Sequence, residues 1–225
     1  RWSNNLAMVA LNTLLLRLAF PIVAMGSALW ADKNNWGLLN QFELPFILSL
    51  IFGFLSLDAL IYWQHRLFHR IPILWRLHRV HHTDLDLDVS SGGRFHPIEI
   101  VLSMLIKMSA VVALGIPVAS VLAFEIILNA SSTFNHANFK VPLFLDGVLR
   151  QFIVTPDMHR IHHSVDPRET DSNFSFSLSL WDRVFGTYCK EPKLGQERME
   201  IGLKEFQSPQ DTTQLLGLLK LPFKK

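Results

Sequence analysis

The sequence predicts an all-α integral membrane protein, and three observations indicate this fold class. First, 49% of the 225 residues are hydrophobic and only 18% are charged, whereas soluble domains carry about 25% charged residues. Second, segments 2–57 and 101–139, together 95 residues, hold only 6 of the 40 charged side chains. Third, four apolar stretches each approach the roughly 20 residues that a membrane-spanning helix needs. We therefore expect about four membrane helices, because a charge at bilayer depth costs several kcal/mol.

The four expected membrane helices follow one another along the chain. They cover about residues 6–30, 44–63, 98–116 and 118–134. The third and fourth are predicted to form a hairpin, because Gly115, Ile116 and Pro117 make a tight turn between them. Any one stretch could be a buried helix of a soluble protein, but four in one short chain favour a membrane protein.

The basic residues predict how the chain is oriented. The loop at 31–43 holds one Lys and no Arg. Four arginines follow the second helix, at positions 66, 70, 76 and 79. The positive-inside rule therefore places the termini and segment 64–97 in the cytoplasm. The single cysteine, Cys189, excludes an internal disulfide and fits a reducing compartment. Because the chain begins with Arg1 rather than Met, we expect a further N-terminal piece with room for another membrane helix.

The remaining segments are expected to lie at or near the membrane surface. In segment 142–154 an apolar stripe is formed by Leu145, Val148, Leu149 and Phe152. The stripe is typical of a helix lying in the membrane interface or of an ordinary amphipathic surface helix. We expect residues 1–190 to form one membrane domain, followed by a cytoplasmic or membrane-surface tail over 191–225.

Histidine is the unusual component, with ten copies, none in the middle of an apolar stretch. Eight form three clusters: His65 and His69; His78, His81 and His82; and His159, His162 and His163. The first pair lies four residues apart on a helix that continues the second membrane helix, so its rings share one face. In each HxxHH cluster the adjacent pair diverges by about 100° and can reach two neighbouring ions. The clusters predict a dinuclear metal centre on one side of the membrane.

The histidine clusters predict that a metal is bound, but they do not determine which metal it is. Imidazole ligands suit Zn, Cu, Fe and Ni, and a structural zinc site needs only four ligands and tends to use Cys. Neutral ligands leave a high positive charge at the centre, so we expect nearby carboxylates to orient the rings and balance this charge. The candidates are Asp58, Asp84, Glu99, Asp157 and Glu169.

Six strings of residues give the chain a family resemblance. They are Tyr62–His69, Leu77–His82, Arg94–Pro97, Phe134–Asn138, Thr155–His163 and Leu180–Tyr188. From about Leu6 to Tyr188 the chain resembles the fatty acid hydroxylase/sterol desaturase superfamily, and within it the bacterial sterol desaturase-like members. The resemblance implies a membrane-embedded non-haem di-iron oxidase with two iron ions bound on the cytoplasmic side. It also implies O₂ as oxidant and a separate electron donor, cytochrome b5-like or ferredoxin-like.

The resemblance also implies which residues bind the iron ions. They are His65, His69, His78, His81, His82, His136, His159, His162 and His163. Some family members carry a further H-x₃-H pair, whereas Ser132 and Lys140 flank His136 at that spacing here. Our hypothesis is that His96 supplies the missing ligand. The alternative is that His96, next to Pro97, only supports the ligands.

The implied function is the hydroxylation of a C–H bond in a membrane lipid, fatty acyl or sterol-like, in lipid biosynthesis. The alternative at the same site is desaturation of a lipid or sterol. An alternative of another class is a His-rich membrane metal transporter or metal-binding protein. Transport requires polar ligands along the spans, which hold only Arg17, Lys107 and Glu125 well inside them.

The net charge of +2 gives no reason to expect a nucleic acid partner. Five residues are candidates to line the substrate entrance, or else to pack in the core: Phe174, Phe176, Leu178, Leu180 and Trp181.

Overall fold

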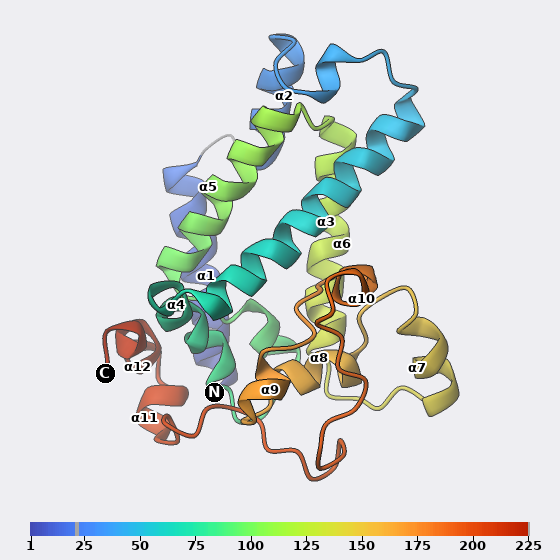
Figure 1. The fold of residues 1–225 in the computed structure, drawn as a ribbon. Coiled ribbons are helices and arrows are strands. Elements are labelled where there is room, and N and C mark those ends of the chain that lie inside the picture. The colour runs from blue at the N-terminus through green and yellow to red at the C-terminus, as the bar shows by residue number, and fades with distance from the viewer. Residues whose placement is uncertain (21–22, 225) are drawn as a thin grey trace.

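The described chain is built of helices. The structure, a computed structural model, describes residues 1–20 and 23–224. Within these residues the only β pairing consists of three isolated bridges. Five helices form the bundle: α1 (Trp2–Ala19), α2 (Val23–Lys33), α3 (Phe46–Arg70), α5 (Pro97–Leu114) and α6 (Val118–Asn135). They run along the long axis of the molecule, and both termini lie at its lower end in Figure 1. This confirms the predicted all-α class.

Four segments are long and apolar enough to cross a membrane, as predicted. The first is Trp2–Lys33, made of α1 and α2, and the others are α3, α5 and α6. In this segment α1 ends at Ala19, Phe20 has a non-helical backbone conformation, and α2 begins at Val23. Pro21, which lies inside the first apolar stretch of the sequence, is outside the described residues. The second predicted membrane helix is α3, which extends to Arg70 and so includes His65 and His69 beyond the predicted apolar stretch.

The predicted hairpin between α5 and α6 is present, and glycine makes its turn possible. Gly115 ends α5 in the left-handed conformation, with φ +65°, a region that other residues enter only at a cost. A Cβ there would lie 2.9 Å from the backbone oxygen of Trp36. Leu38 donates its N–H to the Ala113 carbonyl at 3.1 Å. The hairpin turn is therefore fastened to the α2–α3 connection at the end of the bundle opposite the termini (Figure 1).

Small residues let the long helices pack closely. The main hydrophobic cluster joins α2, α3, α5 and α6 through Ala24, Ala28, Leu57, Met104, Val111, Ile116, Val121 and Phe124. Gly53 permits the approach of α3 to α6, because a Cβ at that position would lie 2.6 Å from Ser120 Oγ. Small residues at helix contacts are typical of membrane bundles. The outer surface is rich in apolar side chains, among them Leu18, Phe46 and Ile126, each more than 60% exposed. An apolar exterior of this extent fits contact with lipid.

Shorter helices form a cap at the lower end of the bundle (Figure 1). They are α4 (Pro72–His82), α7 (Leu143–Leu149), α8 (Pro156–His162), α9 (Pro167–Thr170), α10 (Leu180–Val184), α11 (Pro209–Thr212) and α12 (Leu215–Lys220). A second hydrophobic cluster joins α1, α4 and the C-terminal segment through Met8, Val80, Leu203, Phe206, Leu218 and Leu221. The described part of the tail, residues 191–224, thus packs on the remainder of the chain. Its separation from a domain over 1–190 stays a prediction.

The amphipathic helix expected over 142–154 is shorter in the structure. It is α7, Leu143–Leu149, and its apolar residues are exposed: Phe144 is 85% exposed and Phe152, just beyond the helix, 69%. The apolar stripe therefore faces away from the protein core. Its location in the membrane interface stays a prediction.

Candidate metal centre

Nine histidines are brought together because each lies where a helix reaches the cap. His65 and His69 lie on the last turns of α3, and the His78 cluster lies on α4. His136 follows the last residue of α6, and the His159 cluster lies on α8 and at its end. The rings form two groups. The first is His65, His69, His78, His82 and His162, and the second is His81, His136, His159 and His163. Within each group, one nitrogen atom per ring lies within 4.8 Å of all the others.

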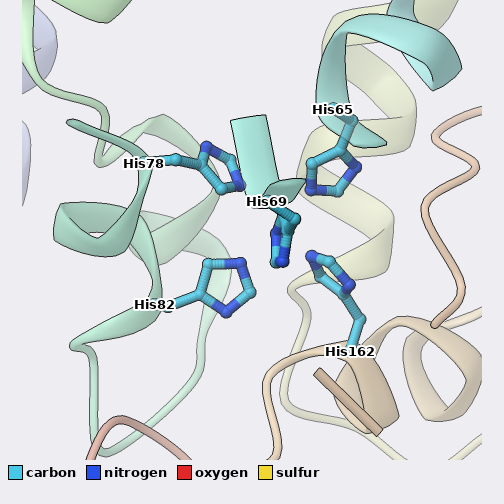
Figure 2. A group of neighbouring side chains, drawn as sticks. All are labelled: His65, His69, His78, His82 and His162. Carbon is cyan, nitrogen blue, oxygen red and sulfur yellow. The ribbon is translucent and has the colours of Figure 1, made fainter. Parts of the chain in front are cut away.

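Figure 2 shows the first group, whose five rings surround a common centre. Backbone carbonyls orient two of the rings: His65 Nδ1 donates to Phe174 O at 2.8 Å and His162 Nδ1 donates to Ser172 O at 2.8 Å. His78 Nδ1 donates to Glu99 Oε1 at 2.6 Å. A carbonyl or carboxylate only accepts, so each of these rings carries its proton on Nδ1 and keeps a lone pair on Nε2.

The inner nitrogens of the first group fit a metal ion. Nε2 of His65, His69, His78 and His162 is buried and has no hydrogen-bond partner among the described residues, and neither does either nitrogen of His82. A buried polar atom without a partner costs about 1–3 kcal/mol. Five such atoms facing one point would make a costly core on their own. Coordination to one ion satisfies all of them.

The second group converges even more closely. Nε2 of His136 lies 3.2 Å from Nε2 of His81 and 3.0 Å from Nε2 of His159, which lies 3.2 Å from Nε2 of His163. His136 Nδ1 donates to Ser132 O at 2.8 Å, so its Nε2 keeps a lone pair. Two nitrogens bound to one ion at about 2.1 Å, with a right angle between them, lie about 3.0 Å apart. The spacing of this group therefore also fits one ion.

Burial keeps the cap histidines neutral. Desolvation lowers the pKa of His136 to about 4 and that of His162 to about 3. Burial, with the neighbouring imidazoles adding to it, also holds the pKa of His81, His82 and His163 well below 6.5. These rings are therefore uncharged at neutral pH. A neutral ring has the free lone pair that a metal ligand needs.

His96 lies outside both groups, which corrects the expectation that it completes the ligand set. Its Nδ1 accepts the N–H of Ile98 at 3.2 Å and so caps α5, and its Nε2 lies 3.3 Å from Leu219 O. Pro97 begins α5 directly after it. The ring therefore folds back over the helix end and is turned to the C-terminal segment.

Of the five predicted carboxylates, Glu99 is the one that contacts a histidine ring in the described part of the chain. Asp58 accepts from Trp181 Nε1 at 2.8 Å and Leu178 N at 3.2 Å, and so holds segment 178–181 against α3.

The other three carboxylates, among the described residues, also make no hydrogen bond to a histidine ring. Asp84 pairs with Arg1 at 2.9 Å and accepts from Ser91 at 2.7 Å. Glu169 accepts from Lys193 N at 2.6 Å. Asp157, in the first turn of α8, has no hydrogen bond to a ring among the described residues.

The sequence reasoning missed one side chain and three carbonyls. The side chain is Asp171, whose Oδ1 lies 3.3 Å from His69 Nδ1 and whose side chain is 51% exposed. The carbonyls are those of Ser132, Ser172 and Phe174. Every residue has a backbone carbonyl, so no sequence signal could have identified these three.

A cavity of about 320 Å³ reaches the histidines from within the bundle. It is lined by residues of α1, α3, α5 and α6 and touches His65, His78 and His81. Of the five aromatic and aliphatic residues expected at the entrance, Phe176 lines this cavity, whereas Phe174 packs on the rings of His65 and His69, 5.7 and 5.1 Å away. The centre can therefore act on a molecule that enters from the bundle.

Comparison with known proteins gives consistent matches. Residues 50–187 match the family model described as fatty acid hydroxylase. The chain is 28% identical over 176 residues to ornithine lipid hydroxylase OlsE of Rhizobium tropici, covering 78% of this chain and 49% of the relative. It is 34% identical over 172 residues to alkylglycerol monooxygenase of Xenopus tropicalis, covering 76% and 36%. It is 29% identical over 156 residues to the very-long-chain aldehyde decarbonylase GL1-1 of Oryza sativa subsp. indica, covering 66% and 25%.

The chain thus spans between a quarter and a half of the length of these curated relatives. No solved structure matches it.

Proposed function

The chain belongs to the fatty acid hydroxylase family, and on this premise we propose that it is a membrane-bound iron enzyme that hydroxylates a lipid. One observation carries the proposal: two groups of buried histidines converge at a cavity that lies among helices long and apolar enough to span a membrane. A site so placed acts on a molecule dissolved in the bilayer. The names of two relatives, a lipid hydroxylase and an alkylglycerol monooxygenase, support the same reaction class.

Two iron ions would be held by the five-histidine group and by the four-histidine group. When bound, they supply the oxidation of an unactivated C–H bond by O₂, in which R–H, O₂, two electrons and two protons give R–OH and water. His65, His78 and His81 line the cavity, so a C–H group in it lies beside ligands of both ions.

The surrounding residues orient the rings and exclude water. Glu99 and the carbonyls of Phe174 and Ser172 fix the first group, and the carbonyl of Ser132 fixes His136. Phe95 stacks on His81 with ring centres 4.4 Å apart. An apolar, closed surrounding protects a reactive centre from side reactions with water.

The electrons come from a separate donor, cytochrome b5-like or ferredoxin-like, that docks on the cap. We place the cap on the cytoplasmic side, because Arg66, Arg70, Arg76 and Arg79 lie at this end of the bundle and basic residues favour the cytoplasmic face.

The test uses iron-loaded protein in lipid nanodiscs, with a chemical reductant, O₂ and the extracted lipids of the host. We expect O₂ uptake and a lipid product heavier by one oxygen atom; a product lighter by two hydrogen atoms would instead show desaturation. The variant His162→Ala removes a ligand and should abolish the product, whereas the matched variant His96→Ala should retain it. Tightly bound zinc without O₂ uptake in the iron-loaded preparation would refute the proposal.

A further inference from the structure

An ion pair lies inside the membrane bundle, away from the histidines. Lys107 of α5 donates from Nζ to Oε1 of Glu125 of α6 at 2.6 Å. The Lys107 side chain is 9% exposed and that of Glu125 is 30% exposed. Ionisable residues within membrane helices are expensive and commonly mark a path for a substrate or an ion. The pair has no part in the metal centre and so requires an explanation of its own.

The pair faces a cavity rather than packed protein. Lys107 and Glu125 both line the 320 Å³ cavity that reaches His65 and His78. An ammonium group has three donors, and the Lys107 ammonium makes one hydrogen bond to the described residues. A bridge that served only to join two helices would be sealed by side chains, because an ion pair in a dry interior is stable only when its remaining hydrogen-bonding groups are satisfied.

A line of polar contacts along α5 connects the pair to the metal centre. Glu99, Ser103 and Lys107 follow at intervals of four residues and share one face of the helix. Glu99 accepts from His78, Ser103 accepts from Gln64, and Lys107 donates to Glu125. Since an α-helix rises 1.5 Å per residue, Lys107 lies about 12 Å along the axis from Glu99. The cavity thus has the histidines at one end and the charged pair at the other.

The walls of the cavity also have free acceptors. Asn12 lines the cavity and is 6% exposed, and its Oδ1 has no hydrogen-bond partner in the described chain. Gln64 lines it as well, and its Oε1 is likewise without a partner. Unpaired buried acceptors are rare in folded proteins. They indicate a ligand that brings hydrogen-bond donors.

We propose that Lys107 and Glu125 form a subsite that binds a polar group of the lipid substrate with no net charge, either hydroxyls or a zwitterion. Such a group accepts from the Lys107 ammonium and donates to the Glu125 carboxylate. A plain hydrocarbon would remove water from the ion pair without offering a hydrogen bond in its place. A group of net charge would attract one partner of the pair and repel the other. This inference rests on the proposed function for the identity of the ligand as substrate.

The test measures binding, so it is independent of turnover. Iron-loaded protein in nanodiscs is titrated with tritiated dodecylglycerol, N-dodecylglycine and dodecane, which carry hydroxyls, a zwitterion and no polar group. The double variant Lys107→Met with Glu125→Leu removes the pair without leaving a single buried charge. The control is Lys140→Met with Glu197→Leu, which removes an exposed pair outside the cavity, 3.5 Å apart. Metal content and melting temperature are recorded for each variant.

We expect the double variant to keep its metal and to bind at least one polar probe at least tenfold more weakly, while dodecane binds as well or better. Which polar probe loses affinity distinguishes hydroxyls from a zwitterion. Affinities for both polar probes within twofold of the parent would overturn the subsite. The charge-swapped variant Lys107→Glu with Glu125→Lys separates loss of the charges from loss of folding, because it restores the bridge. We expect it to keep its metal and to bind the affected polar probe more tightly than the double variant does, and binding as weak as that of the double variant would overturn the proposal. A protein that binds the polar probes through this pair but oxidises no lipid would refute the proposed function alone.

Discussion

Replacing Glu99 with glutamine tests how strongly one carboxylate supports the five-histidine group. Glu99 is 4% exposed, and its Oε1 accepts from His78 Nδ1 at 2.6 Å. Glutamine keeps the shape and one acceptor but removes the charge, and a charge-assisted hydrogen bond is about twice as strong as a neutral one. Losing such a partner of a metal-bound histidine lowers metal affinity about 10–100-fold. This corresponds to about 1.4–2.7 kcal/mol for the ion held by His78.

The measurement is a competition titration with a chelator, with bound metal counted by mass spectrometry. Because His78 belongs to the first group, one of two ions should dissociate earlier in Glu99→Gln while the ion of the second group stays. Glu169→Gln is the matched control, since Glu169 is also buried but accepts from Lys193 N. Equal affinities for both ions in Glu99→Gln and the parent, within twofold, would refute the reasoning. So would an equal loss in Glu169→Gln.

Three further predictions concern the second group and the cap. Gly92→Ala should lower the metal occupancy of the second group, because a Cβ there would lie 3.1 Å from His136 Nδ1. The control Gly147→Ala should keep its metal, because no atom lies within 4 Å of the added Cβ. Equal metal counts in the two variants would contradict this prediction. The metal-free protein should lose stability in melting experiments as pH falls from about 6.5 towards 4 and 3. Burial lowers the pKa of His136 to about 4 and that of His162 to about 3, so in this pH range the unfolded chain binds protons that the folded chain does not. For His136 the resulting loss of folding free energy is about 3 kcal/mol. A melting temperature that does not change with pH over this range would contradict the prediction. His96→Ala should keep both ions in metal analysis and His136→Ala should lose the ion of the second group, whereas loss of one ion in His96→Ala would restore the ligand role first expected for it.

Features encoded within one helix were predictable from the sequence. The spacing of His65 and His69 placed both rings on one face of α3, and the structure brings both into the first group. The Gly115 turn was visible because only glycine takes its left-handed conformation cheaply. The segregation of charge predicted four membrane spans, because the cost of charge in lipid acts on every residue of a span.

Features that depend on tertiary packing were not predictable. His96 sits in a motif that resembles a ligand position, yet its ring caps α5 because Pro97 starts the helix there. Asp58 lies seven residues before His65 on α3, but Leu178 and Trp181, which follow α8 in the chain, both donate to its Oδ2. Asp171 reaches His69 from a loop that no periodicity describes. For Asp58 and Asp171 the partner is distant in the chain, so spacing carries no information about it.

The use of backbone carbonyls to orient three histidines has a consequence for how this site can diverge. The carbonyls of Ser132, Ser172 and Phe174 cannot be removed by exchanging a side chain. Substitutions at Ser132 and Ser172 therefore leave these contacts in place as long as the chain follows the same path, whereas Phe174 also packs its buried side chain on the rings of His65 and His69. Comparisons of residue identity will therefore underestimate how strongly the backbone orients the histidines. Insertion or deletion of one residue between 163 and 174 is a different event, since it shifts two anchors at once. We expect related sequences to vary in residue type across this loop while keeping its length.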